Sequence, residues 1–156
     1  MGKTLEGFEY QWSATDFLGG TIFYKEGENG YIIPDPAFVR DRLVVVRLPI
    51  FDKEYRMHKF MQNPLCSALR QLEKSGFSDF IKTCDGVFVP RHIGRDITKK
   101  LSRHSWGLAI DINAAENPQG TKGNQNNVVV NTFKQFGFLW GGDWRMPYTD
   151  PMHFEM

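Results

Sequence analysis

The pattern of hydrophobic and polar positions predicts short strands near both ends of the chain. The early segments GFEYQW, TIFYKEGENGYIIP and LVVVRLPIF mix aromatic and β-branched residues, and a turn around Gly27 to Gly30 and several prolines separate them. The later segments GVFVPR, FLWGGDW and MHFEM have the same character. We therefore expect small sheets built from short strands.

Two other segments have helical spacing. Asn63 is a suitable N-cap, Pro64 suits the first helical position, and Gly76 ends the pattern. A second helix is expected over VVVNTFKQF, ending at Gly137, and a short helical turn over SDFIKT. The apolar residues of the first helix are expected in the core: Leu65, Ala68, Leu69 and Leu72. Together with the strands, these helices predict one α+β domain.

A charged residue interrupts one of the apolar strands. In SRHSWGLAIDIN, residues 102–113, apolar and other side chains alternate from Leu108 onward, and Asp111 lies in the middle. A buried carboxylate needs a cation, hydrogen-bond donors or a water-filled cleft. His104 precedes Asp111 by seven residues, and Gly107 between them can adopt backbone conformations that let the two converge. A zinc ion would satisfy Asp111, and a salt bridge with His104 is the structural alternative.

The C-terminal segment DPMHFEM supplies two more groups suited to a zinc site. Asp150 stands three residues before His153. Catalytic zinc commonly keeps three protein ligands and one water, and a carboxylate outside the metal shell can take the proton of that water. His104, Asp111, His153 and Asp150 match this requirement.

SRHSWGLAIDIN and WGGDWRMPYTDPMHFEM resemble the paired signatures of the zinc D-alanyl-D-alanine carboxypeptidase family. This family also includes phage endolysins that cut the L-alanyl-D-glutamate bond of peptidoglycan. The resemblance extends from about Leu65 to the C-terminus, and it implies a hedgehog-like metallopeptidase fold with a small antiparallel sheet and a few helices. Residues 53–156 would form the catalytic core of a single domain 1–156, preceded by a β-rich segment, residues 1–52, of unclear role.

Carried over to this chain, the resemblance implies zinc ligands at His104, Asp111 and His153 and a general base at Asp150. DGVFVPR resembles the strand that brings a substrate-orienting arginine to the site, which would be Arg91. Many carboxypeptidases of the family use Glu as the base. The Asp of this chain therefore resembles the endolysin branch.

Other residues are candidates for substrate contact. Trp144 is expected in a cleft wall, as are Trp106 and Trp140, with core packing as the alternative for each. Ser102 is expected to hydrogen-bond the turn before the motif. His92 is expected to line the cleft beside Arg91, with a structural role as the alternative. One further histidine, His58, has no partner at metal-ligand spacing and is expected at the surface.

Two polar segments are expected as loops. GRDITKKLSR, residues 94–103, carries a run of charges typical of a solvated connector, and NAAENPQGTKGNQN is long and rich in Asn and Gly. The two cysteines, Cys66 and Cys84, are expected to be free thiols.

Composition narrows the possible partners. The 19 Lys and Arg nearly balance the 18 Asp and Glu, giving a net charge of +1, so no overall field favours nucleic acid. No apolar run reaches the roughly 18 residues of a membrane span, and the N-terminal residues lack the apolar run of a secretory signal. We therefore expect a protein made in the cytoplasm without stable membrane insertion, and we also expect a monomer. It would reach the bacterial cell wall with the help of a separate membrane-permeabilising protein, as in phage or prophage lysis.

The leading hypothesis is a zinc-dependent peptidase of peptidoglycan stem peptides, of the endolysin L-alanyl-D-glutamate endopeptidase type. A D-alanyl-D-alanine carboxypeptidase is the alternative within the same enzyme class. A binding module stabilised by zinc but without turnover is the alternative from another class, and a plain structural domain with a His104–Asp111 salt bridge is the last.

Overall fold

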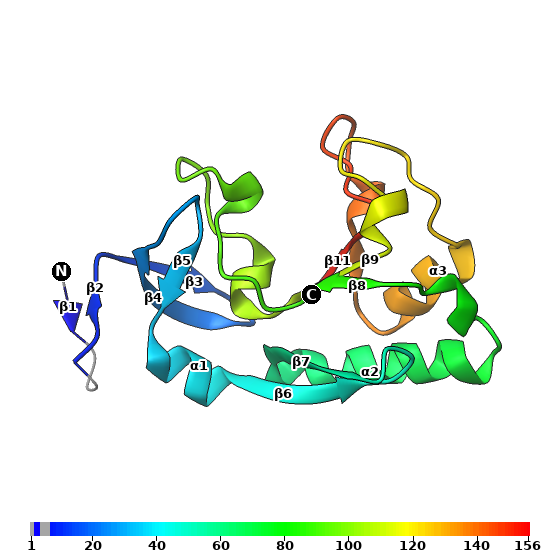
Figure 1. Cartoon of the computed structure of the whole chain (residues 1–156), viewed down its shortest axis with the longest axis horizontal. Helices are drawn as coiled ribbons and strands as arrows, with labels where there is room; N and C mark the ends of the chain where they lie inside the picture. The colour runs from blue at the N-terminus through cyan, green and yellow to red at the C-terminus, as the bar shows by residue number, and fades with distance from the viewer. Residues whose placement is uncertain (1, 4–6) are drawn as a thin grey trace.

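Strands from the first third of the chain form a sheet at one end of the molecule (Figure 1). In this computed structural model, which describes residues 2–3 and 7–156, its antiparallel order is β3-β4-β5. The bounds are β3 Trp12–Asp16, β4 Gly20–Glu26 and β5 Ile32–Pro34, with a separate short pair of β1 Gly2–Lys3 and β2 Glu9–Tyr10. The strands expected in this part of the chain are confirmed.

A helix that the sequence pattern did not predict follows this sheet. Helix α1 spans Pro36–Arg42, and the Asp35 side chain caps it by accepting a hydrogen bond of 2.9 Å from the Ala37 N–H. Asp followed by Pro is a typical helix start, and the signal was hidden between two strand-like segments.

A β-hairpin leads directly into the longest helix. Its strands are β6 Leu43–Leu48 and β7 Lys53–His58, and α2 spans Lys59–Lys74. The expected start of α2 at Pro64 is wrong, because His58 caps the helix earlier by accepting a hydrogen bond of 3.1 Å from the Phe60 N–H. Pro64 lies inside the helix, where its ring nitrogen has no hydrogen to donate to the preceding turn.

The C-terminal half forms a four-stranded antiparallel sheet in the order β10-β11-β9-β8. The bounds are β8 Cys84–Gly86, β9 Ala109–Ile112, β10 Leu139–Trp140 and β11 His153–Glu155, and α3 spans Asn127–Gln135. Five short 3-10 helices connect these elements: η1 Ser78–Phe80, η2 Ile93–Arg95, η3 Arg103–Trp106, η4 Ala114–Glu116 and η5 Gly141–Asp143.

The strand expected over GVFVPR is only partly formed. β8 ends at Gly86, and the Val89 N–H then bonds to the His104 carbonyl at 3.1 Å instead of to β9. Farther on, Tyr31 and Arg91 form an isolated antiparallel bridge. The segment therefore leaves the C-terminal sheet and joins the N-terminal one.

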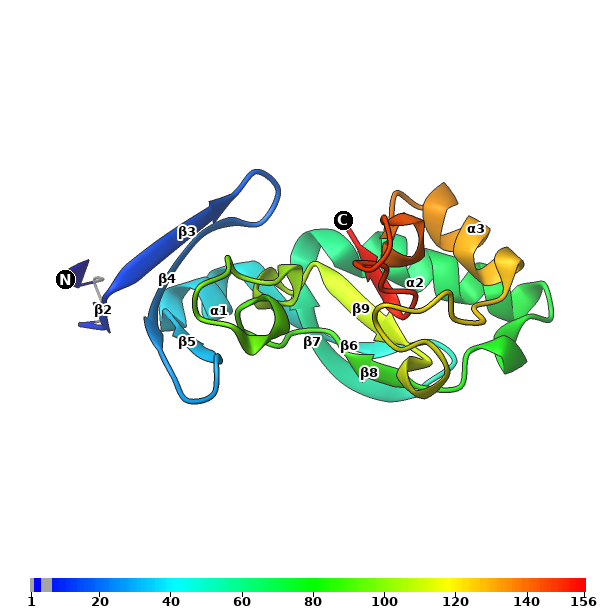
Figure 2. The ribbon, with the colours of Figure 1, turned by 90° about the horizontal axis from the view of Figure 1, so that it is seen from above.

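The core lies where α2 and α3 pack against the C-terminal sheet (Figures 1 and 2). The four α2 residues expected in the core are all 0 % exposed. Ile110 and Ile112 of β9, Phe133 of α3 and Phe154 of β11 share the same cluster. The α+β expectation is confirmed. Among the described residues, no helix has the length and apolarity needed to cross a membrane.

Candidate metal centre

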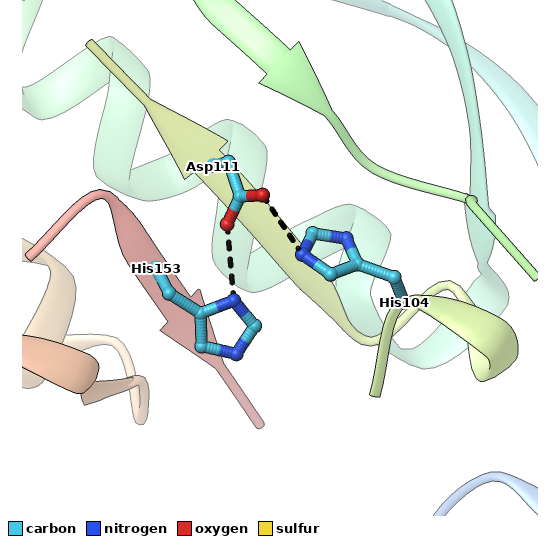
Figure 3. Close-up of side chains that lie close together, drawn as sticks. All are labelled: His104, Asp111 and His153. Atoms are coloured by element: carbon cyan, nitrogen blue, oxygen red, sulfur yellow. Dashed lines mark hydrogen bonds and ion pairs between the residues drawn. The ribbon is translucent and has the colours of Figure 1, made fainter. Parts of the chain in front are cut away.

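Three side chains from two separate parts of the chain converge on one point (Figure 3). His104 comes from η3, Asp111 from β9 and His153 from β11, and each offers one ligand atom within 4.8 Å of the others. Asp111 and His153 are direct cross-strand partners in the antiparallel register of β9 and β11. Strand pairing therefore places two of the three groups side by side.

The turn before β9 brings His104 to the other two. Gly107 ends η3 in the left-handed conformation, at φ +68°, and its N–H bonds to the His104 carbonyl at 3.1 Å. A Cβ at Gly107 would lie 2.7 Å from the backbone nitrogen of His58, so the position also lacks space for a side chain. The conformational freedom expected of Gly107 is confirmed.

The His104 ring presents a lone pair to Asp111. Its Nδ1 lies 2.9 Å from the Val87 carbonyl oxygen, which can only accept, so Nδ1 carries the hydrogen. Its Nε2 is then an acceptor in the neutral ring, 3.1 Å from Oδ2 of Asp111. Among the described residues, this buried Nε2 has no hydrogen-bond partner. Two buried hydrogen-bond acceptors that face each other at this distance are unfavourable unless a cation lies between them.

The His153 ring is oriented in the same way by a carboxylate. Its Nε2 lies 2.8 Å from Oε2 of Glu155 and donates to it, and its Nδ1 lies 3.0 Å from Oδ1 of Asp111. A carboxylate that holds the outer nitrogen of a metal-binding histidine fixes which nitrogen faces the metal. Glu155 was left without a role by the sequence, because alternation alone does not reveal this contact.

The electrostatics of the cluster favour a positive charge. Burial disfavours the imidazolium, but the hydrogen bonds with Asp111 and Glu155 outweigh burial and raise the pKa of His153 to about 9. Burial would also raise the pKa of Asp111, yet its contacts with the two histidines hold the pKa of this carboxyl below its ordinary value. A metal cation would replace the proton that the two carboxylates otherwise attract.

Asp150 lies beside the cluster with an oxygen that is buried and unpaired within the described part of the chain. Burial raises the pKa of Asp150 to about 6, while His153, His104 and Arg91 oppose this rise and the Asp111 carboxylate adds to it. Its backbone is held by a hydrogen bond of 2.8 Å from its N–H to the Gly141 carbonyl. A fixed, desolvated carboxylate of this kind is suited to act as a general base near neutral pH.

A cleft of about 680 Å³ opens over these groups. Its lining includes the three cluster residues and Asp150, together with Arg91, Ser102, Trp106 and Trp144. Trp144 is 37 % exposed, and its ring centroid lies 5.5 Å from that of His153. Arg91, Ser102 and Trp144 are therefore placed where a bound substrate would meet them, although their substrate contacts stay predictions.

His92 is not part of this lining. Its Nδ1 lies 2.6 Å from the Lys99 carbonyl oxygen and its Nε2 lies 3.0 Å from the carboxylate of Glu26, so both nitrogens serve contacts between segments. Ser102 caps η3 by accepting a hydrogen bond of 3.4 Å from the His104 N–H, as expected for a residue of this turn.

The surface position expected for His58 is wrong. Its side chain is 0 % exposed, caps α2 through Nδ1, and lies 3.3 Å from the Gly19 carbonyl oxygen through Nε2. Burial lowers the pKa of His58, because it disfavours the charged form of the ring. Its partner Gly19 is 39 residues away in the sequence, which no local pattern reveals.

Residues 1–52 also form part of the cleft, which the sequence pattern did not predict. Thr15, Asp16 and Tyr31 line the cleft opposite the C-terminal residues. Asp16 forms an ion pair with Arg103, the neighbour of His104 in the sequence, and Arg103 also donates to the Met156 carbonyl. The N-terminal segment of unclear role is thus bound to the site itself.

Three protein ligands with an adjacent free carboxylate are typical of catalytic metal centres rather than structural ones. Residues 96–156 match the model of a protein family described as D-alanyl-D-alanine carboxypeptidase. The comparisons with curated proteins and with solved structures each gave no match. The matched residues contain the whole His104, Asp111 and His153 cluster and Asp150. The match supports a peptidase of this family without distinguishing an endopeptidase from a carboxypeptidase.

Proposed function

We propose that this protein is a zinc-dependent peptidase that hydrolyses amide bonds of peptidoglycan stem peptides. The observation that carries the proposal is the pair of buried, unpaired acceptors on His104 and Asp150, next to a His–Asp–His cluster inside a cleft. Isolated acceptors of this kind are costly in a folded protein unless a ligand satisfies them.

The donor set fits zinc. Two imidazole nitrogens and one carboxylate are a common catalytic zinc shell, which leaves a position for water or substrate. The Val87 carbonyl and the Glu155 carboxylate hold the outer nitrogens of the two histidines, which fixes the ring nitrogen that each would turn toward the metal. When bound, zinc would polarise the carbonyl group of the substrate and lower the pKa of the water molecule that it binds.

The residues of the chain then carry out the proton transfers. Asp150, ionised above a pKa of about 6, takes the proton of the attacking water and passes it to the leaving amine. Arg91, at the side of the cleft, holds a carboxylate or the developing oxyanion of the substrate in its two-pronged guanidinium. Trp144 closes the cleft beside His153.

Two cleavage specificities are open to this site. The Asp at position 150 favours the endolysin-type cut between L-alanine and D-glutamate, in line with the resemblance of the motifs. The family description favours the second candidate, removal of a terminal D-alanine. Digestion of purified sacculi, followed by mass spectrometry of the new termini, separates the two, since the first releases stem peptides and the second releases free D-alanine.

Asp150→Asn tests whether the chain is an enzyme or a zinc-stabilised binding module. The variant should keep the fold and the zinc, measured by elemental analysis, while turnover falls at least ~10²-fold. Asp79→Asn, an exposed change on η1, is the matched control. Near wild-type hydrolysis by Asp150→Asn with zinc bound would overturn the proposed mechanism. Hydrolysis without zinc would overturn the metal assignment.

The proposal also covers the domain organisation, the oligomeric state and the place where the protein acts. We propose that residues 1–156 act as one catalytic domain and as a monomer. We also propose that the protein works on the bacterial wall during phage or prophage lysis. Sedimentation of the zinc-loaded protein tests the oligomeric state.

A further inference from the structure

The cleft has a positively charged part that the proposed chemistry does not use. Arg95 and Lys100, both exposed, line the cleft from the connector between Arg91 and η3. The connector lies beside the β3-β4-β5 sheet, whereas β9 and β11, which carry Asp111 and His153, lie beyond it (Figures 1 and 2).

These two cations are not neutralised by the acidic residues of the cleft. Asp16 is paired with Arg103, and Glu155 and Asp111 are engaged with His153. Among the described residues, neither Arg95 nor Lys100 forms an ion pair. Asp150, the fourth acidic residue of the lining, lies beside the His–Asp–His cluster, so Arg95 and Lys100 remain, within the described chain, as two unpaired cations that attract and orient an anionic part of the substrate.

The scaffold holds this part of the cleft in place. The His92 N–H bonds to the Gly30 carbonyl at 2.9 Å, and the Ile32 N–H bonds to the Pro90 carbonyl at 3.0 Å. Gly30, at φ +77°, packs against the Arg95 backbone so closely that no side chain would fit there. The N-terminal sheet and the connector therefore form one rigid wall.

An aromatic side chain completes this wall. Tyr31, 41 % exposed, lines the same cleft, and its backbone forms the bridge with Arg91. A ring with a hydroxyl group next to two cations offers a flat apolar surface and a further hydrogen-bond donor. This combination suits a peptide that carries a carboxylate, more than it suits a neutral or cationic one.

We propose that Arg95, Lys100 and Tyr31 form a subsite that binds a free carboxylate of the peptide substrate away from the bond that is cut. The proposal rests on the proposed peptidase function and adds the chemistry that the cleft selects. It also gives residues 1–52 a role, because Tyr31 belongs to that segment.

The test uses synthetic stem peptides that differ by one group, with each free carboxylate replaced in turn by its carboxamide. Binding is measured by calorimetry with the zinc-loaded Asp150→Asn protein, so that it does not depend on turnover. The peptide that lacks the carboxylate bound by this subsite should bind about 5- to 10-fold more weakly than the unmodified peptide. This difference in affinity should shrink at high salt, because salt screens the charges.

Lys100→Gln and Arg95→Gln should each remove most of this difference. In the active protein they should raise KM for the carboxylate peptide about 5- to 10-fold and leave kcat unchanged, because the contact is the same in ground and transition states. Lys99→Gln and Arg70→Gln, exposed cations outside the cleft lining, are the matched controls.

Equal binding of every carboxylate and carboxamide pair, or unchanged binding in both Gln variants, would overturn the subsite. Failure of the wild-type protein to cut any peptide would instead overturn the proposed function. The binding measurement would still decide the subsite in that case.

Discussion

Nε2 of His153 donates a hydrogen bond of 2.8 Å to Oε2 of Glu155, which turns the opposite nitrogen of the ring toward Asp111. If His153 binds zinc as proposed, Glu155 would act on the metal through the orientation and basicity of that ring. Glu155→Gln keeps the size of the side chain but removes its charge. We expect the zinc affinity to fall ~10- to 100-fold, measured by competition with a chelator of known affinity.

Glu73→Gln, at an exposed position of α2, is the control for this change. It should leave zinc affinity and activity at the wild-type values. Unchanged zinc affinity in Glu155→Gln would show that His153 does not need this contact to bind the metal.

The dependence of activity on pH follows from Asp150. The base works only when ionised, and burial raises its pKa to about 6, so kcat/KM should fall as the pH drops through that value. A bound cation favours the ionised carboxylate, so the midpoint should lie no higher than about 6. Steady-state kinetics between pH 4 and pH 8, on the order of two units either side of that midpoint, measure this limb.

Zinc content must be measured at each pH in the same experiment, since protons compete with the metal for its ligands. A midpoint well above 7 with full zinc occupancy would contradict the assignment of Asp150 as the base.

Ala substitutions at Gly107 and Gly76 form a matched pair that tests the turn before β9. Both have positive φ, +68° and +78°, but a Cβ at Gly107 would meet the backbone of His58, whereas nothing lies within 4 Å of one at Gly76. Gly76→Ala should cost about 1–2 kcal/mol of unfolding free energy, the strain of a left-handed residue. Gly107→Ala should cost more and should also reduce zinc binding, because His104 is displaced.

Thermal or chemical unfolding of both variants checks this prediction. Equal losses at the two glycines would show that the turn before β9 can relax without disturbing its neighbours.

Arg91→Lys tests the orienting role of the guanidinium. Lysine keeps the charge but loses the two-pronged contact, so we expect normal folding and zinc content with a fall in kcat/KM of ~10-fold or more. Arg56→Lys, on the exposed side of β7, is the control. Wild-type kinetics in Arg91→Lys would transfer the role to Arg95, which lines the same cleft and, among the described residues, forms no ion pair.

The cluster of His104, Asp111 and His153 could be predicted from the sequence, because its residues belong to short, recognisable motifs. An aspartate in an apolar strand, a glycine before it and the spacing of Asp150 and His153 are all visible within short segments. The structure brings these residues together, as the motifs indicated.

The opposite wall of the cleft could not be predicted, because it depends on contacts between segments far apart in the chain. The ion pair of Asp16 with Arg103 spans 87 residues and the contact of His92 with Glu26 spans 66. The same reason explains the error at His58, whose burial depends on Gly19. Local patterns carry no information on such pairs.

The link between Asp16 and Arg103 has a consequence for how a substrate reaches the cleft. The turn after β3 also packs Gly19 against the ring of Trp106. The β3–β4 hairpin therefore contacts both Arg103 and Trp106, on either side of His104 in the sequence. Swinging the hairpin outward would break both contacts and disturb Arg103, the neighbour of His104 in the sequence. We therefore expect no hinged lid on this side, and a peptide chain must slide lengthwise into a groove whose width is set before it arrives.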